Sequence, residues 1–188
     1  MESNSRETRQ VNSGRTTLIF VRHAVAELRV GESEDAERPL SFRGLEQIPP
    51  LLESLQVYRV QYIYASDTRR AAQTANEIGK LLDLTVRLLP ALREVCSNIG
   101  AKPDVGIEQV AQQESLQTFQ QRISEAVDQI VTECLEACTV VVAHSGTIRA
   151  ALHHLLQLPL SAYEVPSIPQ GSIVVVVKHS GGSWNATG

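Results

Sequence analysis

Short apolar runs alternate along the chain with segments in which apolar residues recur every three or four positions. The runs are rich in β-branched and aromatic residues and predict strands at 17–21, 62–65, 85–89, 139–143 and 172–178. The periodic segments predict helices that begin near Ser41 and that span 69–82, 115–137 and 147–156. Strands alternating with helices predict an α/β fold, a three-layer α/β/α sandwich with a mostly parallel central sheet.

Local signals refine this pattern at a few positions. Ser41 is an N-cap residue type, and the Pro49-Pro50 pair requires the helix that follows it to kink or restart. Gly, Pro, Asn and Lys residues between 96 and 108 predict an irregular insertion. The acidic run at 32–37 predicts a solvated loop, which would also disfavour highly anionic substrates.

The length of 188 residues suits one compact domain, and 43% of the residues are hydrophobic, as is usual in globular proteins. We expect a flexible N-terminal tail at 1–15, a single domain at 16–180 and a flexible C-terminal end at 181–188. The tail is polar and lacks the apolar region of a signal peptide, and no run approaches the length of a membrane-spanning helix. A cytoplasmic protein with no membrane partner is therefore expected.

Charge and cysteine content narrow the possible partners. The formal net charge of -4 argues against a general nucleic-acid binder. The three cysteines do not form a disulfide framework, and Cys134 and Cys138 are expected to be small apolar residues in a reducing compartment. No Cys-x-x-Cys pair or nearby histidine completes a zinc site. The sequence leaves the oligomeric state open between monomer and dimer.

Polar and cationic side chains follow three predicted strands at the point where each strand ends. Arg22 and His23 follow the first strand, Arg70 comes shortly after the second, and His144 follows the fourth. In parallel α/β sheets, ligands bind beyond the carboxyl ends of the strands. If these strands are parallel neighbours, the four side chains meet in one crevice, and Arg69 then faces solvent. Taken singly, each residue fits a surface position or a helix cap equally well.

A crevice lined by two guanidiniums and two imidazoles is suited to an anion. Arginine binds phosphate through bidentate, charge-assisted hydrogen bonds and stays charged at any working pH. A histidine held neutral by its second nitrogen is a competent nucleophile, and a second histidine can act as a cationic donor. This set of groups predicts phosphoryl transfer in which arginines replace the metal ion.

Six segments, in order, resemble the motifs of the histidine phosphatase superfamily, also called the phosphoglycerate mutase-like family. Val21-Arg22-His23-Ala24 resembles its Arg-His-Gly signature, and Leu92-Arg93-Glu94 is similar to its Leu-x-Glu segment. The other matching segments lie at 39–47, 66–75, 142–149 and 170–173. Together the matches cover nearly everything from Thr17 to Val177.

The resemblance implies a phosphoglycerate mutase-like fold and a catalytic role for two residues. His23 would be the nucleophile that becomes phosphorylated. Glu94 would be the general acid that protonates the leaving oxygen and then the base that activates water. The resemblance calls for neither a metal nor another cofactor.

The resemblance also assigns the phosphate-binding groups. Arg22, Arg70 and His144 would hold the phosphoryl oxygens through the transfer. The backbone amides around Ser145 and Gly146, at a helix N-terminus, would add further donors to the anion.

Departures from the family pattern favour hydrolysis, and thus a histidine acid-type phosphatase. The residue after the nucleophile is Ala24 rather than Gly, as often occurs in the phosphohistidine phosphatase branch. Val25-Ala26-Glu27 offers little to bind a phosphosugar. The segment between Glu94 and His144 is short for a mutase that must retain its intermediate, so water can complete the reaction.

Three functions therefore stay open. The first is a phosphatase for a phosphorylated small molecule or a phosphohistidine protein, with the segment at 96–114 as the candidate lid for a small substrate. The second is a phosphoglycerate mutase-type phosphotransferase, which needs phosphosugar-binding residues that the sequence does not offer. The third is a non-catalytic phospholigand-binding protein on the same fold, which the complete set of catalytic residue types disfavours.

Overall fold

The computed structural model describes residues 14–28, 35–94, 114–158 and 168–187, and a central sheet runs through them. The strands are β1 (Arg15–Arg22), β2 (Tyr62–Ala65), β3 (Val86–Leu88), β4 (Cys138–Ala143), β5 (Ile173–His179) and β6 (Trp184–Thr187). The α-helices are α1 (Phe42–Glu46), α2 (Ile48–Leu55), α3 (Arg69–Leu82), α4 (Leu116–Glu133) and α5 (Ser145–Leu156). Two short 3-10 helices, η1 (Asp35–Glu37) and η2 (Pro90–Leu92), complete the described elements.

The six strands form one sheet in the order β3-β2-β4-β1-β5-β6. The first four strands are parallel to one another, whereas β5 runs antiparallel to β1 and β6 antiparallel to β5. The mostly parallel sheet expected from the sequence is therefore confirmed. Its antiparallel part lies at the edge formed by the last two strands.

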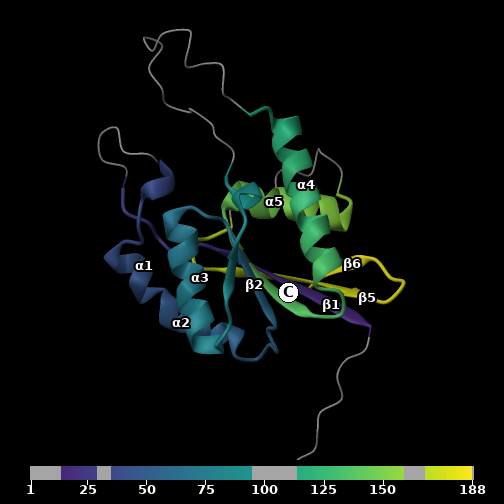
Figure 1. Cartoon of the computed structure of the whole chain (residues 1–188), viewed down its shortest axis with the longest axis horizontal. Coiled ribbons are helices and arrows are strands. Elements are labelled where there is room, and N and C mark those ends of the chain that lie inside the picture. Colours follow the sequence, from purple (N-terminus) through teal and green to yellow (C-terminus); the bar gives the residue numbers. More distant parts are fainter. Residues whose placement is uncertain (1–13, 29–34, 95–113, 159–167, 188) are drawn as a thin grey trace, which may run out of the picture.

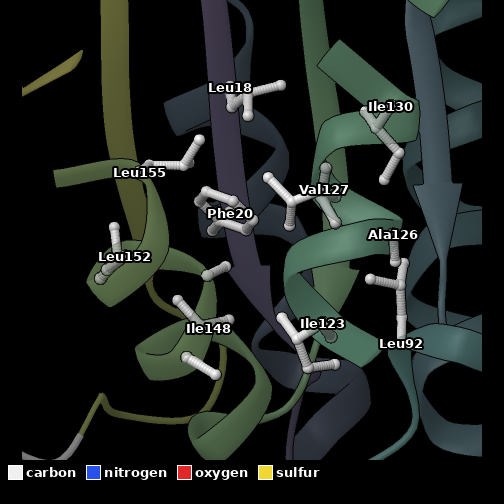
Figure 2. Packing of buried hydrophobic residues seen from close by; sticks show 14 of the residues in the cluster. Leu18, Phe20, Leu92, Ile123, Ala126, Val127, Ile130, Ile148, Leu152 and Leu155 are labelled. Carbon is white, nitrogen blue, oxygen red and sulfur yellow. The ribbon is translucent and has the colours of Figure 1, made fainter. Parts of the chain in front are cut away.

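Both faces of the sheet are covered, which confirms the three-layer sandwich (Figure 1). Leu18 and Phe20 of β1 point to the face covered by α4 and α5, and Ile19 and Val21 point to the face covered by α2 and α3. Alternate residues of a strand point to opposite faces, so a run with no polar residue needs cover on both sides. Figure 2 shows Phe20 packed beside Val127 and close to Ile148.

Several elements begin and end where the sequence predicts. The second strand and the 69–82 helix match β2 and α3. Ser41 is the N-cap of α1, and its side chain accepts a hydrogen bond from the Gly44 amide. The helix restarts as α2 after a break at Gln47, because the first turn of a helix tolerates proline.

The larger differences from the sequence prediction are at the end of α4 and at the C-terminus. The long helix ends at Glu133 rather than at 137, because Glu136 adopts a left-handed backbone (φ 57) and the chain turns into β4. The expected flexible end at 181–188 contains β6, which pairs with β5 through Val177 and Asn185. Trp184 packs against the α4–α5 side of the core, so tertiary contacts rather than local pattern order this strand.

The predicted N-terminal tail and insertion lie mostly outside the described residues. Arg15, expected in the tail, is already the first residue of β1. The insertion at 96–108 and nearly all of the candidate lid at 96–114 are outside the described ranges. Among the helices that the structure describes, none is both long and apolar enough to cross a lipid bilayer.

Candidate active site

The register of the sheet sets His23 beside His144. Arg22, the last residue of β1, pairs with Ala143, the last residue of β4, so the next residue of each strand leaves the sheet at the same height. The two imidazole rings lie edge to face, with centroids 5.0 Å apart. Ala65 ends β2 on the other side of β4, which brings the start of α3 to the same edge. The carboxyl ends of β1, β2 and β4 therefore lie together at one edge of the sheet, as the sequence predicts.

His23 is held as a neutral imidazole, and both of its ring nitrogens have hydrogen-bond partners. Its Nδ1 donates to the Ala24 carbonyl at 2.7 Å, and its Nε2 accepts from Arg70 Nε at 3.1 Å. This pairing fixes the tautomer with the proton on Nδ1. Burial lowers the pKa of His23 to about 4, and the charges of Arg70 and Arg22 act in the same direction, whereas the bond to Ala24 opposes them. The lone pair of Nε2 is thus unprotonated at neutral pH.

His144 is more deeply buried and is also neutral. Its Nε2 lies 3.0 Å from Ser66 Oγ and 3.3 Å from Thr68 Oγ1. Burial lowers the pKa of His144 well below its usual value, and the neighbouring His23 ring and the charge of Arg70 act in the same direction. The sequence suggested a cationic donor at this position, but desolvation keeps the imidazole uncharged while no anion is bound.

The two predicted arginines line the same cluster from different elements. Arg70, in the first turn of α3, is only 4% exposed, whereas its neighbour Arg69 faces solvent as expected. Arg22 Nη1 donates to the Ile168 carbonyl at 2.5 Å. Arg22 Nε and His144 Nδ1 are buried without a hydrogen-bond partner among the described residues.

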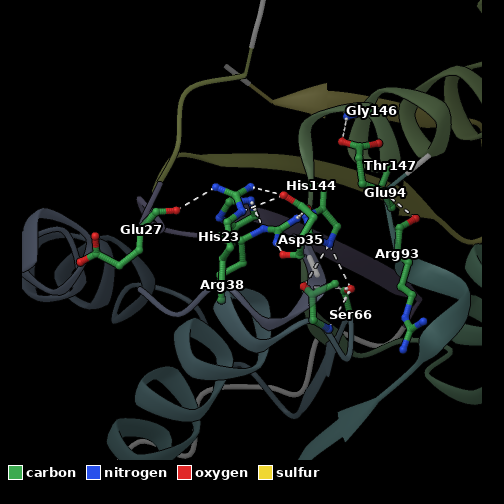
Figure 3. Close-up of polar contacts among 12 residues, drawn as sticks. His23, Glu27, Asp35, Arg38, Ser66, Arg93, Glu94, His144, Gly146 and Thr147 are labelled. Carbon is green, nitrogen blue, oxygen red and sulfur yellow. Dashed lines mark hydrogen bonds and ion pairs between the residues drawn. The ribbon is translucent and has the colours of Figure 1, made fainter. Parts of the chain in front are cut away.

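Glu94 follows η2 and contacts the start of α5. Its Oε2 accepts a hydrogen bond from the Gly146 amide at 2.8 Å, and Figure 3 shows the carboxylate turned toward that glycine. The Gly146 amide, expected to be a donor to an anion, therefore already has a partner. Ser145 begins α5 directly after His144, with a half-buried side chain.

Sequence analysis missed two residues of this cluster, Asp35 and Arg38. Asp35 was assigned to a solvated loop, yet its Oδ2 accepts from Arg70 Nη2 at 2.9 Å and its Oδ1 from Arg38 Nε at 2.7 Å. Its backbone carbonyl also accepts from Arg70 Nη1 at 2.6 Å. The i, i+3 spacing of Asp35 and Arg38 was the only local signal for an ion pair, and it carried no indication of Arg70.

Two polar side chains and one glycine fix the shape of the loop around His23. Gln47 Oε1 accepts from the Val25 amide at 2.8 Å, and Gln47 Nε2 donates to the Gln170 carbonyl at 2.9 Å. Thr74 Oγ1 accepts from the Ala24 amide at 3.2 Å. A Cβ on Gly44 would overlap the Val25 carbonyl. The segments at 39–47 and 66–75 thus brace the loop that carries His23.

The donor set of the site suits an anion better than a cation. Three arginines and two histidines lie in mutual electrostatic contact there, with Asp35 and Glu94 as the acidic groups among them. In the parts of the chain that the structure describes, no three His, Cys, Asp or Glu side chains are grouped to hold a metal ion.

Comparison with protein families decides the class of the chain. The family described as the histidine phosphatase superfamily (branch 1) matches residues 18–187. The chain belongs to the histidine phosphatase superfamily. This match confirms the family resemblance drawn from the motifs. An 8-oxo-(d)GTP phosphatase of Mycolicibacterium smegmatis is 33% identical to this chain over 79 residues. The aligned part is 42% of this chain and only 24% of that relative.

Solved structures confirm the phosphoglycerate mutase-like fold of this chain. A mycobacterial glucosyl-3-phosphoglycerate phosphatase is 24% identical, with a TM-score of 0.75 over 92% of this chain and 97% of that one. A phosphoglycerate mutase from Bacillus anthracis is 22% identical, with a TM-score of 0.74 over 95% of this chain and 94% of that one. Phosphatases and a mutase share the fold, so the fold alone does not choose between them.

Proposed function

We propose that this chain is a metal-independent phosphatase that hydrolyses a phosphomonoester or a phosphohistidine through a covalent phosphohistidine on His23. The observation that carries the proposal is the state of His23, a neutral imidazole whose Nε2 lone pair lies within a cluster of arginines. A neutral imidazole is nucleophilic, and surrounding guanidiniums stabilise the charge on a phosphoryl group during transfer.

The reaction proceeds in two displacements at phosphorus. In the first, Nε2 of His23 forms a bond to phosphorus, and the bond from phosphorus to the leaving group breaks. In the second, water attacks phosphorus, the N–P bond breaks, inorganic phosphate leaves and His23 is restored. The bond from Nδ1 to the Ala24 carbonyl stabilises the ring as it gains positive charge in the first step.

Arg22, Arg70 and His144 are the proposed ligands of the phosphoryl oxygens. Arg22 Nε and His144 Nδ1 are buried polar atoms that lack hydrogen-bond partners within the described residues, and buried polar atoms are costly to leave unpaired. An anion bound between them would supply acceptors to both. A bound anion would also raise the pKa of His144, so that its ring becomes the cationic donor expected from the sequence.

Glu94 is the proposed general acid and base. Its carboxylate interacts with the charges of Arg22 and Arg70, which sets it at the rim of the same cluster. As an acid it would donate a proton to the leaving oxygen, and as a base it would take one from the attacking water. Ser145, next to His144, is proposed to bind the phosphoryl group from the start of α5.

A phosphorylated small molecule is the substrate class that the comparisons favour. The similar proteins include a glucosyl-3-phosphoglycerate phosphatase and an 8-oxo-(d)GTP phosphatase, both named for small phosphorylated molecules. A phosphohistidine protein is the second candidate, because Ala24 follows the nucleophile as it often does in that branch.

The test is hydrolysis of 4-nitrophenyl phosphate at mildly acidic pH in the presence of EDTA, for the wild type and His23→Ala. A matched control is His154→Ala, because His154 lies on α5 and pairs with Asp128 at the surface. We expect turnover that resists EDTA, persists in the control and disappears in His23→Ala. Quenching with SDS at alkaline pH during turnover should trap an acid-labile, base-stable phosphoprotein in the wild type and in the control, but not in His23→Ala. Activity that survives His23→Ala would overturn the mechanism.

A further inference from the structure

The carboxylate of Asp35 lies between the guanidiniums of Arg38 and Arg70. Asp35 Oδ1 accepts from Arg38 Nε, with Arg38 Nη2 at 2.6 Å, and Oδ2 accepts from Arg70 Nη2 at 2.9 Å. Two guanidiniums from separate elements thus donate to the two oxygens of one carboxylate. Figure 3 draws Asp35 and Arg38, which are joined by the hydrogen bond from Arg38 Nε, among the residues of the cluster. The same planar forks bind phosphoryl oxygens with equal ease.

The contacts of Asp35 also keep the nucleophile covered. Arg70 Nε donates to Nε2 of His23, the atom that must attack phosphorus. Arg70 is held in this pose by both the side chain and the backbone carbonyl of Asp35. His23 is only 5% exposed. A phosphoryl group reaches Nε2 only if Arg70 moves its Nε–H off the lone pair, and the bonds to Asp35 oppose that movement.

Exposure makes Asp35 the displaceable partner in this arrangement. The Asp35 side chain is 51% exposed, whereas that of Arg70 is 4% exposed and that of Arg38 is 24% exposed. Released from the arginines, the carboxylate regains full hydration at little cost, but Arg70 has no such alternative. A phosphomonoester dianion also brings more negative charge to the two guanidiniums than one carboxylate does.

Arg38 is oriented independently of Asp35. Its Nη1 donates to the Glu27 carbonyl at 2.9 Å, so the guanidinium has a second anchor that persists when the carboxylate leaves. Its positive charge lowers the pKa of both His23 and His144, after larger effects of burial and of the nearer charges. Arg38 is therefore close enough to influence the reacting groups.

We propose that Asp35 is an internal competitor that occupies the place of a substrate phosphoryl oxygen between Arg38 and Arg70, and that Arg38 binds the phosphoryl group once Asp35 is displaced. This inference rests on the proposed phosphatase site, because it adds one ligand and one competitor to it. Burial of Asp35 raises its pKa, but Arg70 and Arg38 more than offset this and hold the pKa below its usual value. The competitor is therefore ionised throughout the neutral range.

The two residues are expected to act on phosphate binding in opposite directions. Asp35→Asn removes the charge of the competitor, so the dissociation constant of inorganic phosphate should fall by roughly threefold to tenfold. Arg38→Gln removes a cationic ligand, so the same constant should rise by roughly tenfold. The probe is inorganic phosphate at neutral pH and fixed ionic strength, measured by isothermal titration calorimetry on the full chain.

Asp67→Asn is the matched control. Asp67 forms a bidentate pair with Arg93 at the rim of the site, through Oδ1 at 2.7 Å and Oδ2 at 2.6 Å. This control loses the same charge beside a different arginine, so its phosphate affinity should stay within about twofold of wild type. Circular dichroism melts establish that each variant folds, and Asp35→Ser replaces Asp35→Asn if the latter is unstable.

The outcomes separate this inference from the proposed function. Weaker or unchanged phosphate binding in both Asp35 variants would overturn it, because the carboxylate would then position the arginines rather than compete. Unchanged phosphate binding in Arg38→Gln would show that Arg38 is not a ligand. Undetectable phosphate binding in both the wild type and Asp35→Asn would overturn the roles of both residues. Because the assay needs no turnover, a chain that binds as expected yet hydrolyses nothing keeps this inference and overturns only the phosphatase.

Discussion

Glu94 fills the space that a side chain at Gly146 would need. A Cβ built on Gly146 would overlap Oε1 of Glu94, while the glycine amide donates to Oε2 of the same carboxylate. The glycine is thus required by its neighbour rather than by its backbone, because it lies within α5, where alanine is favourable. Glu94, the proposed general acid, can hold this position only because residue 146 has no Cβ.

Gly146→Ala is therefore expected to displace Glu94 and to slow turnover. We expect kcat on an aryl phosphate to fall by roughly tenfold or more, because general acid–base catalysis is lost, with a smaller change in phosphate affinity. Steady-state kinetics and phosphate titration measure the two effects separately.

A double mutant makes this prediction specific. Truncation of the carboxyl group in Glu94→Ala removes the overlap, so adding Gly146→Ala to that background should cost neither further activity nor stability. If the second substitution lowers kcat in the Glu94→Ala background as much as it does in wild type, Gly146 acts by another route.

The buried imidazole of His23 makes the stability of the fold depend on pH. The folded-state pKa of about 4 lies below the ordinary value of 6.5, so between these values the unfolded chain binds more protons than the folded one. His23 therefore contributes fully above pH 6.5, and its contribution is lost as pH falls toward 4. We expect a loss on the order of 3 kcal/mol across this window from this group.

Urea denaturation at several pH values measures that loss. His23→Asn keeps a donor for the Ala24 carbonyl but has no titrating ring, so its unfolding free energy should fall less steeply between pH 6.5 and 4. Equal slopes for the variant and the wild type would show that His23 is not the group that titrates.

Gln47 is expected to stabilise the fold by joining two loops at the site. It bonds the Val25 amide on one side and the Gln170 carbonyl on the other. Gln47→Leu has a similar volume but leaves both backbone groups unpaired, which should cost about 1–3 kcal/mol in urea denaturation. Gln56→Leu, at an exposed helix end, is the comparison and should change stability by less than about 0.5 kcal/mol. A similar loss in both variants would contradict the bridging role.

Leu92 couples the core to the acid side of the site. It is fully buried against the α4 face of the core and lies two residues before Glu94 (Figure 2). Leu92→Ala should lower the unfolding free energy by about 2–5 kcal/mol and reduce kcat as well. Leu88→Ala, on a half-exposed edge strand, should leave kcat unchanged and cost less than about 1 kcal/mol. If Leu92→Ala is destabilised but keeps the kcat of the wild type, Leu92 does not support the position of Glu94.

Much of the fold was predictable because the local sequence pattern and the tertiary packing favour the same elements. The apolar, β-branched run of β1 fits a strand buried on both faces, and α3 has a clear apolar stripe in the sequence. The edge strand β6 was not predictable. Its four residues are mostly exposed and follow a glycine-rich turn, so only pairing with β5 makes them a strand.

The residues of the candidate site also divide into those that the sequence predicts and those that it does not. His23, Arg22 and His144 were predictable because the ends of parallel strands meet at one edge, and their motifs are specific. Asp35 was not, because an acidic residue in a polar stretch is indistinguishable from any solvated one. Its contact with Arg70 spans a sequence separation of 35 residues and depends on how η1 packs against α3.

The order of strands in the sheet has a consequence for the chain as it is synthesised. Of the described strands β1 is made first, yet its two neighbours in the sheet, β4 and β5, are made only after β2 and β3. A nascent chain that has not yet reached Cys138 therefore carries an apolar strand with two open edges, the kind of segment that recruits other strands. Ribosome-bound or truncated forms ending before that residue should depend on chaperones for their solubility, and they cannot bring the two histidines together.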